Sequence, residues 1–337
     1  MSVSILGTPK VSVSMITYNH EKFIAQAIES VLMQETSFPF ELVIGEDCST
    51  DRTREIALMY QSKYPDKIRL LLPETNLGMM RNFAQTMQTC QGQYIALLEG
   101  DDYWTSPEKL QKQVNFLDNH PECVTCFHNV LVINESNNES YLHSRYVAKS
   151  VYALEDLLVQ NPVPTCSTMF RNGLWDRFPE WYYGLKLGDW PLHIMNARYG
   201  QTMYLDEVLA KYRHHAGGVW SSQNLIYQCT SFIDMLEKIN RFLGFQYHLI
   251  IAQSVSKVYF ELFCAYASMH KTSEANKYLR KCWRTAILFN PCNRKRFGFT
   301  ALQLYCPSLY LYMRKLKKKC QVACRVFDIR HYYNFSV

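Results

Sequence analysis

Short apolar segments and helical repeats alternate along the first 130 residues. Five segments rich in Val, Ile and Leu have the length and composition of buried strands: Val11–Tyr18, Phe40–Glu46, Ile68–Leu72, Tyr94–Leu98 and Val124–Val132. Between them, apolar residues recur at helical spacing. Because strand and helix alternate as in right-handed βαβ crossovers, we predict an α/β fold with a mostly parallel, doubly wound sheet.

Polar residues and prolines indicate where several helices begin. Asp51 is a candidate N-cap for a helix over Thr53–Tyr64, Asn76 or Asn82 opens the next helix, and Ser106-Pro107-Glu108 opens a fourth. Beyond Gln223 the pattern is helical and aromatic almost to the end. We therefore predict two parts, an α/β domain over residues 1–225 and a mainly helical region over 226–337.

Charge is distributed unevenly between these two parts. The chain has 337 residues, is 48% hydrophobic and has a formal net charge of +6. Residues 241–337 hold 17 Lys or Arg against three acids, a balance of +14, so 19 basic and 27 acidic residues remain for residues 1–240, a balance of −8. A basic C-terminal region predicts an anionic partner, either membrane lipid or nucleic acid.

Several patterns bear on the cellular compartment. No run of 18 uncharged apolar residues occurs, so we expect no conventional membrane span. The first ten residues lack an apolar core long enough for a secretory signal, and the 12 cysteines show no framework spacing. We therefore expect reduced thiols and a cytoplasmic location.

Candidate chemistry lies where the predicted strands end, because ligands of open parallel sheets bind at the carboxyl ends of strands. There the chain reads Thr17-Tyr18-Asn19-His20, Glu46-Asp47 and Glu99-Gly100-Asp101-Asp102. Three acids in four positions indicate a site for Mg²⁺ or Mn²⁺, although a solvated loop with a capping Asp is an equal alternative. No glycine-rich phosphate loop follows the first strand, which argues against P-loop ATPases and dinucleotide oxidoreductases.

Several motifs occur in an order that resembles glycosyltransferase family 2. They are Val13–Asn19, Glu46–Thr53, Asn76-Leu77-Gly78 with Arg81-Asn82, Leu98–Trp104, Gly188–Pro191 and Tyr212–Gly218. The resemblance covers roughly residues 10–221. It implies a GT-A fold that binds a nucleotide-sugar, usually a UDP-sugar, and transfers the sugar with inversion at the anomeric carbon.

The resemblance also implies roles for individual residues. It places the donor nucleotide against Thr17, Tyr18, Asn19, Asp47, Asn76, Arg81 and Asp101, and the metal at Asp101, Asp102 and His215. Glu99 stands where the family usually has Asp. Its extra methylene group changes how, or whether, its carboxylate contacts the metal or the ribose. For His215, a loop histidine held by a backbone hydrogen bond is an equal alternative.

Inversion requires a general base that accepts the proton of the attacking hydroxyl. The family's acidic base motif matches Asp189, which is the candidate catalytic residue. An aspartate before Trp-Pro is also a good helix N-cap, and one carboxylate can do both.

Residues 277–319 interleave aromatic, apolar and cationic side chains. Such a segment can lie in a membrane interface with its cations against anionic headgroups, or form the basic outer face of a packed helical domain. We favour the membrane, and we expect no nucleic acid because no nucleic-acid-binding module is recognisable.

Together these patterns predict a cytoplasmic enzyme, peripheral to the membrane, that uses Mn²⁺ or Mg²⁺. It would transfer one sugar from a UDP-sugar to a lipid-linked glycan for surface polysaccharide, since the QxxRW motif of the family's processive members is absent. Two alternatives remain open: a non-catalytic nucleotide-sugar-binding protein, and a soluble transferase that acts on protein or small molecules.

Overall fold

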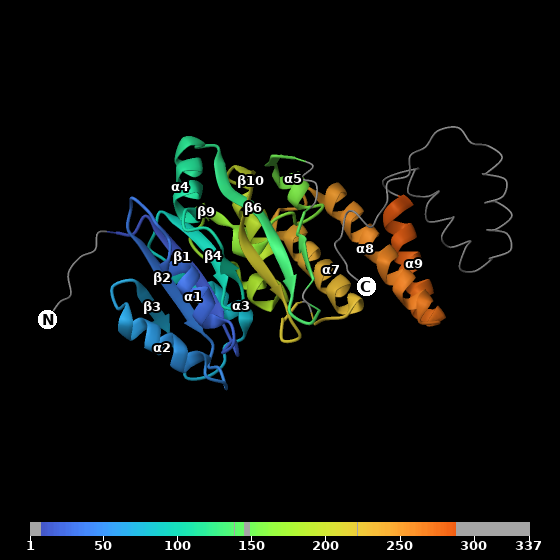
Figure 1. The fold of residues 1–337 in the computed structure, drawn as a ribbon. Coiled ribbons are helices and arrows are strands. Elements are labelled where there is room, and N and C mark those ends of the chain that lie inside the picture. Colours follow the sequence, from blue (N-terminus) through green and yellow to red (C-terminus); the bar gives the residue numbers. More distant parts are fainter. Residues whose placement is uncertain (1–7, 138, 145–148, 221, 288–337) are drawn as a thin grey trace. The chain divides into compact units, whose positions relative to one another are not determined.

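A computed structural model describes residues 8–287, except 138, 145–148 and 221 (Figure 1). The chain forms two compact units. The N-terminal unit comprises residues 1–157 and 161–222, and the C-terminal unit comprises residues 158–160 and 223–337.

The N-terminal unit is built on one sheet with the strand order β3-β2-β1-β4-β9-β6-β10-β5, in which β7 also pairs with β6 and β8 with β10. The strands are β1 Val11–Thr17, β2 Phe40–Glu46, β3 Ile68–Leu71, β4 Tyr94–Glu99, β5 Tyr103–Trp104, β6 Cys123–Asn134, β7 Ser140–Leu142, β8 Val151–Tyr152, β9 Met169–Arg171 and β10 Gln201–His214. Strands β3, β2, β1 and β4 run parallel, as do β6 and β10, whereas β9 runs antiparallel between β4 and β6. The predicted α/β fold with a mostly parallel sheet is confirmed.

Helices connect these strands. They are α1 Ile24–Leu32, α2 Thr53–Lys63, α3 Met79–Thr89, α4 Lys109–Asn119, α5 Leu154–Leu157 and α6 Asp189–Asn196, with 3₁₀ helices η1 Thr165–Ser167 and η2 Glu180–Gly184. Strands β1, β2 and β4 are buried along nearly their whole length, which explains their continuous apolar sequences.

Two predicted helix starts need correction. Helix α2 has Arg52 in the N-cap position, and Asp51 lies one residue earlier, where its Oδ1 accepts the backbone N–H of Thr53 at 2.9 Å. Helix α3 begins after Gly78, whose φ of 82° favours glycine, so neither candidate asparagine is its cap. Asn82 is buried inside α3 and donates to the carbonyl of Gly45 at 2.8 Å, because its position faces β2.

The C-terminal unit is helical in the part that the structure describes, with α7 Leu225–Phe242, α8 His248–Ser268 and α9 Thr272–Ile287. The predicted helical character of this region is confirmed. Helix α8 is, by length and composition alone, able to cross a membrane, although half of its apolar window is buried. A core helix can have the same length and composition, so the expectation of no membrane span stays a prediction.

Candidate functional site

An acidic cluster lies at the carboxyl end of β4. Carboxylate oxygens of Glu99, Asp101 and Asp102 all lie within 4.8 Å of one another. Asp102 is 1% exposed, and its Oδ1 accepts the backbone N–H of Arg213 at 2.8 Å. Its Oδ2 is buried and has no hydrogen-bond partner of ordinary geometry within the described part of the chain, and the thiol of Cys166 acts on this carboxyl as a weak donor that lowers its pKa. Burial, followed by repulsion from Asp101, raises the pKa of both Glu99 and Asp102.

This arrangement fits a divalent cation. Three converging carboxylates repel one another, and a buried oxygen without a partner of ordinary geometry costs free energy that a metal ion would offset. Carboxylate oxygens are the ligands that Mg²⁺ and Mn²⁺ prefer. Glu99, Asp101 and Asp102 are therefore the residues that could hold the ion.

Two imidazoles flank Asp101. Its Oδ2 lies 3.0 Å from Nε2 of His215 and 3.6 Å from Nε2 of His20. Burial opposes ionisation of Asp101, but the hydrogen bond from His215 and the charges of both histidines together hold its pKa below the ordinary value. The structure thus brings His215 to the acidic cluster through a contact with the carboxylate of Asp101. It places His215 beside Asp101, outside the group of three converging ligand atoms.

His20 was given no role in the sequence analysis, although it directly follows the first motif. Its backbone N–H donates to Oγ1 of Thr53 at 2.8 Å, and its Nδ1 lies 3.2 Å from Oγ1 of Thr17. Burial lowers the pKa of His20. A Cβ added to Gly100 would lie 2.5 Å from Oγ1 of Thr17, so only glycine allows β4 to end this close to β1. Of the residues that the family resemblance places at the donor nucleotide, Thr17 is 2% exposed and Tyr18 is 42% exposed.

The loop after β1 is joined to the loop after β2 by side chains. Oδ1 of Asn19 accepts the backbone N–H of Thr50 at 2.8 Å, and Oδ2 of Asp51 accepts that of Glu21 at 3.1 Å. Asn19 has a φ of 56°, a conformation that asparagine tolerates better than most residues. Its side-chain oxygen therefore serves to hold the two loops together.

Asp47 and Asn76 are brought together at the start of α3. The carboxylate of Asp47, 2% exposed, accepts the backbone N–H groups of Leu77 at 2.7 Å and Gly78 at 2.9 Å. Nδ2 of Asn76 donates to the carbonyl of Asp47 at 2.8 Å. Burial raises the pKa of Asp47, and the hydrogen bonds from Leu77 and Gly78 only partly offset this effect. The pair fixes the turn from which α3 begins.

The first turn of α3 lies beside the loop that precedes Asp189. Arg81 is exposed, and its guanidinium carbon lies 5.5 Å from the ring centroid of Tyr183 in η2. A Cβ added to Gly188 would lie 3.1 Å from the Tyr182 hydroxyl and 3.5 Å from Sδ of Met80. Helix α3 therefore connects the Asp47 turn with the Asp189 loop.

Asp189 is the first residue of α6, and Gly188 occupies the N-cap position. Its Oδ2 lies 3.2 Å from Nδ2 of Asn161 and 3.3 Å from Oγ1 of Thr165, which both donate to it. Burial raises the pKa of Asp189, and the charge of Asp189 in turn raises the pKa of Glu99. The two carboxyl groups are thus within electrostatic reach of each other, as the predicted base and the predicted cation site would have to be.

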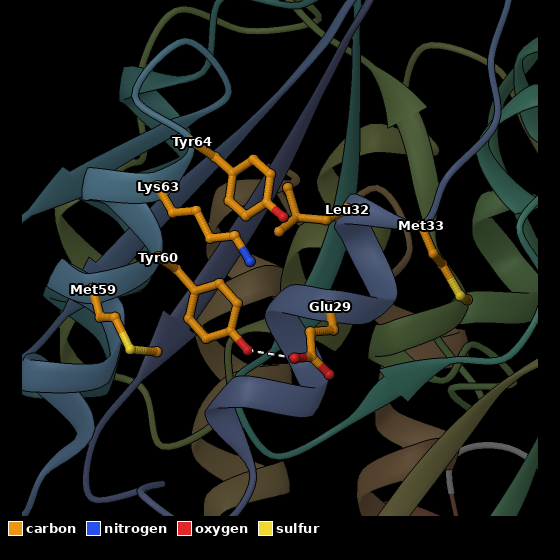
Figure 2. A pocket seen from close by; sticks show the side chains of 7 residues that line it. All are labelled: Glu29, Leu32, Met33, Met59, Tyr60, Lys63 and Tyr64. Carbon is orange, nitrogen blue, oxygen red and sulfur yellow. Dashed lines mark hydrogen bonds between the residues drawn. The ribbon is translucent and has the colours of Figure 1, made fainter.

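A separate cavity of about 380 Å³ lies between α1 and α2 (Figure 2). Its lining residues are Glu29, Leu32, Met33, Met59, Tyr60, Lys63 and Tyr64. The Tyr60 hydroxyl donates to Oε1 of Glu29 at 2.5 Å, as the dashed line in Figure 2 shows. None of the predicted site residues lines this cavity.

Comparison with known proteins supports the family resemblance. The sequence profile of glycosyl transferase family 2 matches residues 12–178. An uncharacterized protein of Mycobacterium tuberculosis is 39% identical over 212 residues, which are 63% of this chain and 60% of that protein. The poly(ribitol-phosphate) beta-N-acetylglucosaminyltransferase TarS of Staphylococcus aureus is 37% identical over 117 residues, 33% of this chain and 19% of TarS. The chain thus spans about 60% of the length of the mycobacterial relative.

Solved structures agree on the fold. The crystal structure of S. aureus TarS matches with a TM-score of 0.59 and 18% identity, over 95% of this chain and 57% of that one. The mannosyltransferase PcManGT from Pyrobaculum calidifontis, in complex with GDP-Man and Mn²⁺, matches with a TM-score of 0.55 and 15% identity, over 93% and 85%. These similarities show the GT-A fold. The predicted resemblance to glycosyl transferase family 2 is confirmed by the match of residues 12–178.

Proposed function

We propose that the chain is a metal-dependent inverting glycosyltransferase, with its catalytic domain in residues 1–225. It transfers one sugar from a UDP-sugar to a lipid-linked glycan acceptor in surface polysaccharide biosynthesis. The observation that supports this most directly is the cluster of Glu99, Asp101 and Asp102, in which a buried Asp102 oxygen has no partner of ordinary geometry within the described residues and the nearby Asp189 can act as base.

The donor would bind along the carboxyl ends of β1, β2 and β4. The exposed ring of Tyr18 and the turn that Asp47 holds would be available to the nucleoside, and Asp101 and Asp102 would face the diphosphate. A bound Mn²⁺ or Mg²⁺ would act as a Lewis acid that stabilises the charge developing on the departing nucleotide. Asp101, kept ionised by its histidine neighbours, and Asp102 would hold that ion, with Glu99 beside them.

Asp189 would accept the proton of the acceptor hydroxyl as that oxygen attacks the anomeric carbon. Two hydrogen bonds from Asn161 and Thr165 orient the carboxylate, and its raised pKa makes it a stronger base than an exposed aspartate. The sugar–phosphate bond breaks on the opposite face, which gives inversion.

The named relatives support the donor and acceptor classes. One TarS structure is a complex with UDP-GlcNAc, and the PcManGT structure is a complex with GDP-Man and Mn²⁺. The name of TarS describes transfer to poly(ribitol-phosphate), a polymeric acceptor. A glycan acceptor for this chain rests on that analogy.

The basic segment over 277–319 would hold the enzyme at the cytoplasmic face of the membrane. Residues 277–287 belong to α9, and residues 288–319 lie outside the described part of the chain. Lys277, Lys281 and Arg284 follow one another at helical spacing on one exposed face, and Trp283 of the same helix is 38% exposed. Exposed cations and an exposed tryptophan suit anionic headgroups and the membrane interface.

Calorimetric titration of UDP into the purified chain, first with Mn²⁺ and then with EDTA, tests the donor site. We expect binding with Mn²⁺ and none with EDTA, and we expect Asp101→Ala to abolish the metal-dependent binding. Equal binding of UDP by the Asp101→Ala variant would contradict the metal assignment. Binding of GDP but not UDP would replace the UDP-sugar donor by a GDP-sugar.

A further inference from the structure

Arg213, near the end of β10, is buried beneath the acidic cluster at 6% exposure. Nη1 of its guanidinium donates to the backbone carbonyl of Asp101 at 2.5 Å, and its own backbone N–H donates to Oδ1 of Asp102 at 2.8 Å. One residue thus contacts both aspartates of the turn that follows β4.

The remaining donors of the guanidinium attach this turn to two other elements. Nε donates to Oε1 of Glu135 at 3.2 Å, just after β6, and Nη2 donates to Oε1 of Gln26 in α1. The guanidinium carbon lies 4.3 Å from the ring centroid of Tyr103 and 5.0 Å from that of Phe23. Arg213 therefore joins the ends of β4, β6 and β10 to α1.

We propose that Arg213 is a positioning residue that holds the Asp101–Asp102 turn in the geometry required for the divalent cation. The inference rests on the cation site of the proposed function. Arg213 has no free electron pair for a metal, so it acts only through the two aspartates. Its fixed fork of donors reaches a carbonyl, a carboxylate and an amide at once, which the single ammonium of lysine cannot do.

Binding of Mn²⁺ alone, followed by electron paramagnetic resonance on the full chain, tests the inference without a turnover assay. We expect Arg213→Lys to weaken Mn²⁺ binding about tenfold or more, the usual cost of removing a residue that orients metal ligands. Gln26→Leu removes one of the anchors and leaves the aspartates in place, so we expect a smaller weakening, about two- to threefold, in a variant that folds readily.

Arg171→Lys is the matched control. Arg171 also donates to backbone carbonyls, those of Leu117, His120 and Cys123, and lies over the ring of Tyr94 at 5.6 Å, but it sits near the opposite ends of the strands. If Arg213 were merely structural, both lysine variants would lower the urea midpoint and leave Mn²⁺ affinity unchanged.

Unchanged Mn²⁺ affinity in Arg213→Lys and in Gln26→Leu would overturn the positioning role while the cation site stands. An equal loss of affinity in Arg171→Lys would overturn it as well, because the effect would then be general. Failure of the unsubstituted chain to bind Mn²⁺ would overturn the cation site and this inference with it.

Discussion

Lys109, the first residue of α4, is a buried cation with few partners. It is 0% exposed, its Nζ donates to Oε1 of Gln113 at 2.6 Å, and it lies 4.1 Å from the ring centroid of Trp104. Burial lowers the pKa of Lys109 from 10.5 to about 7. At a pH where Lys109 is protonated in the folded chain, its buried charge lowers the free energy of unfolding. We therefore expect Lys109→Met to raise the free energy of unfolding at that pH.

The size of the effect follows from the shift in pKa. In the unfolded chain Lys109 stays protonated up to about pH 10, whereas in the folded chain it loses its proton near pH 7. Between these values the unfolded state binds more protons, so the folded state gains stability as pH rises. At about 1.4 kcal/mol per pH unit, the advantage of Lys109→Met over the unsubstituted chain should fall by about 3 kcal/mol between about pH 6 and about pH 9.5.

Comparing the two chains at two pH values removes effects that do not depend on pH. Loss of the hydrogen bond to Gln113 and the change in side-chain volume shift the advantage equally at both values. Urea unfolding followed by tryptophan fluorescence provides the assay, because five of the six tryptophans lie before residue 223.

Lys22→Met serves as the control, since Lys22 is exposed. Its stability difference from the unsubstituted chain should be the same at both pH values. An advantage of Lys109→Met that is independent of pH would show that Lys109 keeps its ordinary titration in the folded state, and would refute the reasoning.

Four further predictions concern the site. Asp189→Asn should keep Mn²⁺-dependent UDP binding and lose transfer at least about 100-fold, as removal of a general base does; full turnover would exclude Asp189 as base. Because burial raises the pKa of Asp189, the transfer rate of the unsubstituted chain should begin to fall, as the pH is lowered, before the pH reaches about 4, where an ordinary aspartate is protonated. A transfer rate that stays constant down to about pH 4 would contradict this. Mn²⁺ should raise the thermal midpoint of the unsubstituted chain and not that of Asp102→Asn, and equal shifts would remove Asp102 from the cation site. Gly100→Ala should destabilise the fold by about 1–3 kcal/mol, measured by urea unfolding, because its Cβ would lie 2.5 Å from Oγ1 of Thr17.

Much of the fold could be predicted because strands buried on both faces have continuous apolar sequences. β1, β2 and β4 were recognisable in this way. β9 was not, because three residues that pair antiparallel with β4 and β6 carry no periodic signal. The start of α3 was misplaced because Gly78, in a positive-φ turn, begins this helix without a side-chain cap.

The acidic cluster could be predicted because its members are close neighbours in the sequence. Glu99, Asp101 and Asp102 directly follow one strand, and a single turn brings them together. His20 and Arg213 act on the same turn from 81 and more than 100 residues away. Their contacts depend on the tertiary pairing of strands, which a local pattern does not encode.

The position of β4 in the sheet explains why the site forms there. On one side β4 pairs with parallel β1, whose end carries Thr17 and His20; on the other side it pairs with antiparallel β9. β6 lies next to β9 and pairs with β10, so the chain returns through β10 and delivers Arg213 and His215 to the end of β4. The acidic turn therefore lies at the junction between the parallel half of the sheet and the half that contains β9. The residues proposed to bind the donor come from the first half, and those proposed to orient the aspartates come largely from the second. The geometry of the proposed cation site therefore depends on the pairing of both halves.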